Sequence, residues 1–148
     1  MRQLPTGAAP MRLLQFLLLA CVLALGACAS GSSARDALER AQYAWSGAIR
    51  WGDFAGARNL VDPEVRAARP LSEMEMARYE QVQVSSYRST GASTDLDAGL
   101  AAREVRIGVI NRHTMAEREV AYREQWRWDE QAGTWWLTSD LPDLWSGR

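Results

Sequence analysis

The sequence predicts an α+β fold in which N-terminal helices pack on the concave face of a curved antiparallel sheet. Two observations favour this class. Up to Tyr79 the apolar residues recur every three or four positions, whereas from Glu80 onward they alternate with polar residues. Clusters of turn-forming residues separate the alternating segments, which is typical of strands that pair with their neighbours. Helices followed by strands indicate separate helical and sheet layers rather than βαβ units.

Residues 1–27 are predicted to be a lipoprotein signal peptide. Arg2 and Arg12 supply a positively charged start, and Leu13–Leu25 form an apolar stretch that is too short for a comfortable membrane span. The end of this stretch, Leu25-Gly26-Ala27-Cys28, resembles the lipobox of bacterial lipoproteins. The alternative interpretation is an ordinary secretory signal with an incidental cysteine.

The lipobox resemblance implies cleavage before Cys28 and attachment of diacylglycerol and palmitate-type acyl chains there, which would anchor the protein durably. Ala29, rather than Asp, follows that cysteine. By resemblance to the enterobacterial sorting rule, this implies the periplasmic face of the outer membrane. Cys21 would leave with the signal peptide, so no disulfide is expected. Residues 28–33 are then a lipidated cysteine and short tether, and residues 34–148 a single periplasmic domain.

The first predicted helix runs from Arg35 to Trp51. Ser33 is its expected N-cap, and Gly52 is its expected stop. The stripe expected to face the core contains Leu38, Gln42, Trp45 and Ile49.

Two shorter helices are predicted next. Phe54–Val61 form one, which Asp53 caps and Asp62-Pro63 ends. The other begins at Ser72, because Ser72-x-x-Glu75 is a capping box.

Four strands are predicted after the helices. They span residues 80–89, 101–110, 115–129 and 135–139, with turns at 90–99, 111–114 and 130–133. Leu141–Trp145 are expected to form a tail that folds back.

Two stretches resemble the nuclear transport factor 2-like superfamily, a cystatin-like α+β cone. They are Trp51-Gly52-Asp53-Phe54 and the final hairpin, Trp126-x-Trp128 to Gly133-Thr134-Trp135-Trp136-Leu137. The resemblance covers roughly residues 34–139 and implies a cone-like packing of helices on the sheet. Its members include isomerases, dehydratases and catalytically silent partner-binding domains, so the fold does not fix the function.

Glu124 is the most informative polar residue, because it interrupts an apolar face of the third strand. A four-residue loop from Arg112 to Met115 would place Arg103 directly opposite it, and a two-residue loop would make the two charges diagonal neighbours. One interpretation is a structural ion pair. The other is a pocket floor in which Glu124 acts as general base and Tyr122 as donor, although an arginine neighbour makes a carboxylate a poorer base.

Other binding groups are few. His113, the single histidine, falls at a predicted hairpin tip, so no catalytic role is expected for it. Without more histidines or a free cysteine, neither a metal site nor a cofactor is expected. An apolar cavity inside the cone would be lined by Tyr43, Trp45, Tyr122 and Trp126.

The opposite face of the predicted sheet carries mixed charge. Arg106, Arg123 and Arg127 lie there and form the preferred interaction surface, although a solvated face is the simpler interpretation. Trp135 and Trp136 are adjacent, so they should point to opposite faces, and the outward one would suit an interface.

Charge and composition restrict the function. The chain has 148 residues, 17 of them arginine and none lysine, and a formal charge of −1, which argues against a nucleic-acid partner. The sequence favours an outer-membrane-anchored periplasmic lipoprotein that binds an envelope protein, or itself as a homodimer, without catalysis. The alternatives are a small apolar ligand binder that uses the cone cavity and, after it, an isomerase- or dehydratase-like enzyme.

Overall fold

The computed structural model describes residues 33–145. The predicted signal peptide and the lipidation site Cys28 lie outside the described residues. A first helix, residues 33–51, precedes three short helices and a four-stranded antiparallel sheet of order β1-β2-β3-β4. The elements are α2 (Phe54–Arg58), α3 (Pro63–Ala68), α4 (Glu73–Tyr79), β1 (Val82–Asp95), β2 (Leu100–Asn111), β3 (Glu117–Asp129) and β4 (Thr134–Leu137). This arrangement confirms the α+β class.

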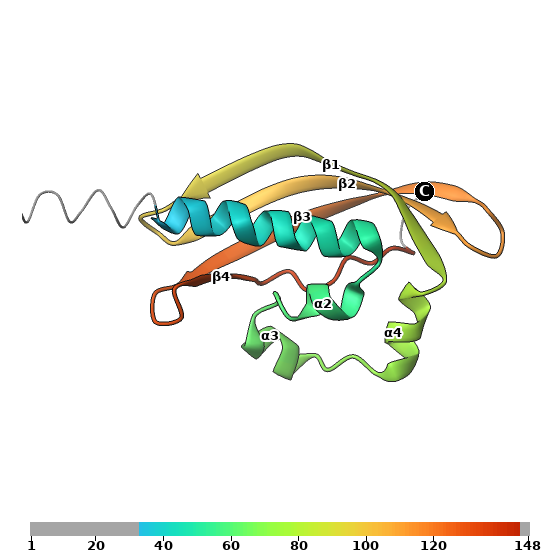
Figure 1. Ribbon diagram of the computed structural model, residues 1–148, viewed down its shortest axis with the longest axis horizontal. Helices are drawn as coiled ribbons and strands as arrows, with labels where there is room; N and C mark the ends of the chain where they lie inside the picture. Colours follow the sequence, from blue (N-terminus) through green and yellow to red (C-terminus); the bar gives the residue numbers. More distant parts are fainter. Residues whose placement is uncertain (1–32, 146–148) are drawn as a thin grey trace, which may run out of the picture. The chain divides into compact units, whose positions relative to one another are not determined.

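The first helix runs along the sheet, and the three short helices gather beside its C-terminal half (Figure 1). Within residues 33–145, no helix combines the length and the apolar character that crossing a bilayer requires.

The first helix ends at Trp51, as predicted, and Gly52 is the reason. Its φ of +74° lies in the left-handed region that glycine adopts without strain. The Gly52 N–H donates to the Ile49 carbonyl at 3.2 Å, and the Asp53 N–H donates to the Ala48 carbonyl at 2.9 Å. These two bonds form a Schellman motif, which satisfies the last carbonyls of the helix.

The second helix is shorter than predicted. Asp53 caps α2 by accepting the Gly56 N–H at 2.8 Å, but α2 ends at Arg58 instead of continuing to Val61. Val61 instead forms a parallel bridge to Leu137 beside β4. The buried side of this segment therefore joins the sheet rather than prolonging a helix.

Asp62-Pro63 begins a helix and does not end one. The Asp62 carboxylate accepts the Glu64 N–H at 2.8 Å, and Pro63 takes the first position of α3, where its missing N–H has no cost. The sequence pattern predicts no helix here, because six residues are too few to show a helical repeat. The capping box at Ser72 and Glu75 is present at the start of α4, as predicted.

The sheet extends further than the sequence predicts at the first hairpin. β1 continues to Asp95 and β2 begins at Leu100, so the turn spans 96–99 instead of 90–99. The register shifts between Val84 and Ser86 and again between Ser89 and Gly91. These two bulges bend β1, which is an edge strand.

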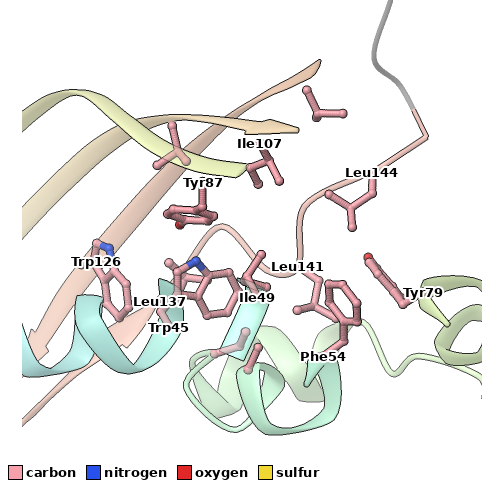
Figure 2. Packing of buried hydrophobic residues seen from close by; sticks show 14 of the residues in the cluster. Trp45, Ile49, Phe54, Tyr79, Tyr87, Ile107, Trp126, Leu137, Leu141 and Leu144 are labelled. Carbon is pink, nitrogen blue, oxygen red and sulfur yellow. The ribbon is translucent and has the colours of Figure 1, made fainter. Parts of the chain in front are cut away.

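The core lies between the first helix and the sheet, with a second part around the C-terminal tail. Trp45, Ile49 and Trp126 meet in the first part, and Phe54 and Tyr79 lie in the second (Figure 2). Leu141 and Leu144 are buried, and the rings of Tyr79 and Trp145 lie 4.9 Å apart. The tail thus folds back, as predicted, and the structure shows that it packs on α4.

Candidate functional site

Glu124, a carboxylate on β3, is fully buried. Arg103 donates to both of its oxygens, from Nη2 at 2.7 Å and from Nε at 3.0 Å. The Trp126 indole donates at 2.9 Å, and the Tyr87 hydroxyl donates to Oε1. Four hydrogen bonds from three side chains therefore hold one charge, which is what a buried carboxylate requires.

The strand register explains the position of Arg103. Arg103 on β2 lies directly opposite Glu124 on β3, which confirms the pairing predicted from the longer hairpin loop. Its side chain is 16% exposed, and its Nη2 also donates to the Gln42 carbonyl at 3.3 Å. The ion pair therefore also ties the first helix to the sheet.

Tyr87 is the member of this cluster that the sequence does not predict. Simple alternation from Val84 would point Tyr87 outward, but the bulge at Ser85 returns it to the inward face. Gly108 lies opposite Ser86 in the register, and a Cβ on this glycine would lie 2.5 Å from the Ser85 hydroxyl oxygen. A glycine in a strand otherwise rich in branched residues is the signal that indicates such a bulge.

The two phenols near Glu124 stay neutral. Burial raises the pKa of Tyr87 far above its ordinary value, and the charge of Glu124 raises it further. Burial likewise raises the pKa of Tyr122. Tyr122 donates to the Asp140 carbonyl at 2.6 Å and bonds the Ser139 hydroxyl at 2.9 Å. Both hydroxyl protons are therefore committed to acceptors within the protein.

The arrangement of the cluster around Glu124 suits a structural role. A general base needs a lone pair that is open to a substrate. Both Glu124 oxygens already receive donors, and the side chain is fully buried. Tyr122, the proposed donor, bonds Ser139 and Asp140 instead of Glu124.

Three of the four aromatic residues expected to line a cavity lie together. Trp45 stacks on Tyr122 with ring centroids 6.2 Å apart, and meets Trp126 edge-on at 6.3 Å. Trp45 and Trp126 are fully buried, so they fill the interior against each other. Tyr43 is 81% exposed, which corrects its predicted place beside Trp45, because positions two apart on a helix point to opposite sides.

The arginines of the expected interaction surface each meet an acid. Arg123 lies 2.9 Å from Glu104, and Arg106 lies 4.0 Å from Glu119. Arg127 lies 2.6 Å from Asp62, the N-cap of α3. A partner on this face would therefore compete with existing ion pairs.

The remaining residues singled out in the sequence are two tryptophans of β4 and the single histidine. Trp135 is buried and Trp136 is half-buried on the opposite face of β4, as their adjacency predicts. His113 is exposed in the turn after β2. In the part of the chain that the structure describes, no three His, Cys, Asp or Glu side chains gather closely enough to hold a metal ion.

The fold is similar to that of a solved structure. It is the solution structure of a SEC-C motif containing protein from Rhodopseudomonas palustris, with a TM-score of 0.51 and 20% identity over 63% of this chain and 68% of that one. A likeness at this identity concerns the fold alone. No protein-family model matches the chain, and no curated protein matches it in sequence.

Proposed function

We propose that this protein is a periplasmic lipoprotein, anchored to the outer membrane through Cys28, and that it acts as a non-enzymatic module that binds another envelope protein. We also propose that its helices cover the concave side of the sheet in the cone-like manner of the nuclear transport factor 2-like superfamily. The lipobox at residues 25–28 supports the anchor. The sequestered Glu124 supports a role without catalysis.

The observation that carries the binding role is an exposed aromatic stripe on the first helix. Tyr43, Gly47 and Trp51 are spaced four residues apart and therefore share one side of the helix. Tyr43 is 81% exposed and Trp51 is 89% exposed. A Cβ on Gly47 would meet no atom within 4 Å, so the space between the two rings is open.

This stripe has the composition of a binding surface. Tyrosine and tryptophan are the residue types that most often dominate the energy of protein interfaces. The same four-residue spacing places the exposed acid Glu39 one turn before Tyr43, and Asp36 lies beside it, so acidic side chains border the stripe at one end. A partner with an apolar surface fits it better than the charged head groups of a membrane.

The proposed anchor keeps the domain close to membrane-bound partners. Five residue steps separate Cys28 from Ser33, the first helical residue described, and an extended chain covers at most ~17 Å over that length. The partner is therefore expected among proteins held at or near the same membrane.

Site-specific photocrosslinking in the intact envelope tests the proposal. A photoreactive residue at Tyr43 should capture one envelope protein, and the second change Trp51→Ala should abolish that capture. The matched position is Arg106 on the outer face of the sheet. Capture from Arg106 but not from Tyr43 would move the interface to the Arg106, Arg123 and Arg127 face. Capture of a second copy would identify a homodimer, and no capture from either face would overturn the binding role.

A further inference from the structure

A cleft of about 430 Å³ opens between α4 and the C-terminal tail. Its apolar walls are Leu71, Tyr79, Leu141 and Trp145. None of the residues that bind Glu124 lines it. This volume falls in the range of sites for small ligands, which combine apolar walls with a few placed polar groups.

Two arginines supply those polar groups. Arg78 lies over the Trp145 ring, with Cζ 4.4 Å from the ring centroid, and its guanidinium donates no hydrogen bond to a described residue. Arg69 lies 3.8 Å from the Asp140 carboxylate through Nη1, which is too far for a hydrogen bond. In contrast, Arg58 and Arg103 direct their donors to acceptors within the protein.

The acids around the cleft are already engaged. Glu75 accepts the N–H and the hydroxyl of Ser72 in the capping box of α4, at 2.9 and 2.8 Å. Asp143 accepts the Trp145 N–H at 3.0 Å. Asp140 accepts from Arg58 at 3.2 Å. The cleft therefore offers a ligand unused donors, whereas each of these acids already accepts a hydrogen bond from the protein.

We propose that this cleft binds an organic carboxylate that carries an aromatic or branched apolar group. The carboxylate lies between the guanidinium groups of Arg69 and Arg78, each of which can donate two parallel hydrogen bonds to it. The apolar group lies against Leu71 and Leu141, beside the Tyr79 ring. The Tyr79 hydroxyl donates to the Pro142 carbonyl at 3.1 Å and is not part of the recognition.

Two kinds of molecule carry such a carboxylate beside an apolar group. One is a free small acid, and the other is a polypeptide, at its C-terminal residue. The inference does not rest on the lipid anchor or on the aromatic stripe of the first helix. Failure of carboxylate binding would leave the proposed function unchanged, and failure of crosslinking would leave the cleft unchanged.

Calorimetric titration of the purified full chain in detergent tests the inference. The probes are N-acetyl-phenylalanine and N-acetyl-phenylalaninamide, which differ only in the carboxylate. We expect the acid to bind at least tenfold more tightly than the amide. Arg69→Gln and Arg78→Gln should each weaken binding of the acid by tenfold or more. Arg78→Lys should lie between Arg78→Gln and the unmodified protein, because it keeps the charge and loses the planar fork.

Arg106→Gln is the matched control, because Arg106 is a half-exposed arginine on the sheet, outside the cleft. It should leave the affinity unchanged, and thermal unfolding of every variant checks that the fold is kept. A peptide that ends in phenylalanine, with a free or an amidated C-terminus, identifies the source. Tighter binding of the free peptide than of the acetylated amino acid indicates a polypeptide end, and equal or weaker binding indicates a small acid. Equal binding of acid and amide, no binding of either, or unchanged affinity in Arg69→Gln and Arg78→Gln would overturn the inference.

Discussion

Glu124 and Glu104 occupy neighbouring ion pairs of the same two strands, in opposite environments. Glu124 pairs with Arg103 on the buried face, and Glu104 pairs with Arg123 on the exposed face. Glu124→Gln would leave the Arg103 charge largely buried without its partner, a loss that we expect to lower the free energy of unfolding by about 3 kcal/mol. Glu104→Gln should cost under ~1 kcal/mol, because water screens an exposed pair.

Chemical denaturation of the two variants measures this difference. The comparison is well matched, since both substitutions remove one carboxylate charge at adjacent positions of one register. Similar losses in both variants would show that the buried network contributes no more than a surface ion pair.

The buried tyrosines give the protein a defined response to alkaline pH. Burial, followed by the charge of Asp140, raises the pKa of Tyr79 to about 12. In the unfolded chain a phenol loses its proton near pH 10. Between these values the folded state holds more protons than the unfolded state, so stability is complete below about pH 10 and falls as the pH rises.

Tyr79→Phe should make this alkaline decline less steep. The removal of one such group reduces the slope by up to ~1.4 kcal/mol per pH unit. Denaturation at about pH 9 and about pH 11 measures the slope. Because the substitution also removes the hydrogen bond to Pro142, the variant loses stability at both pH values, and only the slope is diagnostic. An unchanged slope would mean that Tyr79 titrates alike in both states.

At the scale of the element, the first helix has one glycine inside it and one directly after its end, and the same substitution has opposite effects at the two. Gly52 adopts a φ of +74° in the terminating Schellman motif, so Gly52→Ala should cost about 1 kcal/mol of stability. Gly47 lies inside the helix with open space around its Cβ position, so Gly47→Ala should add about 0.5–1 kcal/mol.

Thermal unfolding of the two variants tests the sign of each effect. Circular dichroism of the same samples shows whether the helix content is kept. If Gly47→Ala also destabilised the protein, the helix interior would be more crowded than the structure indicates.

The elements that the sequence predicts well are those determined by local chemistry. The capping box at Ser72, the stop at Gly52 and the register that pairs Arg103 with Glu124 each follow from residues a few positions apart or from the alternation of one hairpin. The bulge that turns Tyr87 inward depends on Gly108 of the neighbouring strand. The alternation of residues along β1 alone therefore cannot predict this bulge, because its cause lies on β2.

The same limit applies to α3 and to Val61. Six residues after a proline carry no periodicity, so Asp62-Pro63 is equally consistent with a stop and a start. Val61 pairs with Leu137, which is distant in the sequence, and this contact ends α2 early. The cleft depends on the tail packing against α4, so its composition could not be predicted from either segment alone.

At the scale of the whole molecule, the predicted anchor and the folded domain make separate contributions. The cluster around Glu124 is closed, whereas the stripe of Tyr43 and Trp51 and the cleft of Arg69 and Arg78 are open to solvent. These two surfaces involve different residues. The protein partner and the carboxylate that we propose for them would therefore not compete for the same residues, and the proposed anchor would set only where the domain binds them.

The two cysteines allow the anchor to be tested without disturbing the domain, because both precede the described residues. Cys28→Ser removes the thiol that forms the thioether, so metabolic labelling with a palmitate analogue should be lost. Cys21→Ser is the matched control and should leave labelling unchanged, because that residue belongs to the predicted signal peptide. The mature protein should also resist maleimide after denaturation, since its remaining cysteine would be lipidated. Labelling that persists in Cys28→Ser would show that the acyl chain is attached elsewhere than Cys28, and a mature chain with a reactive thiol would show that residues 1–27 are not a lipoprotein signal.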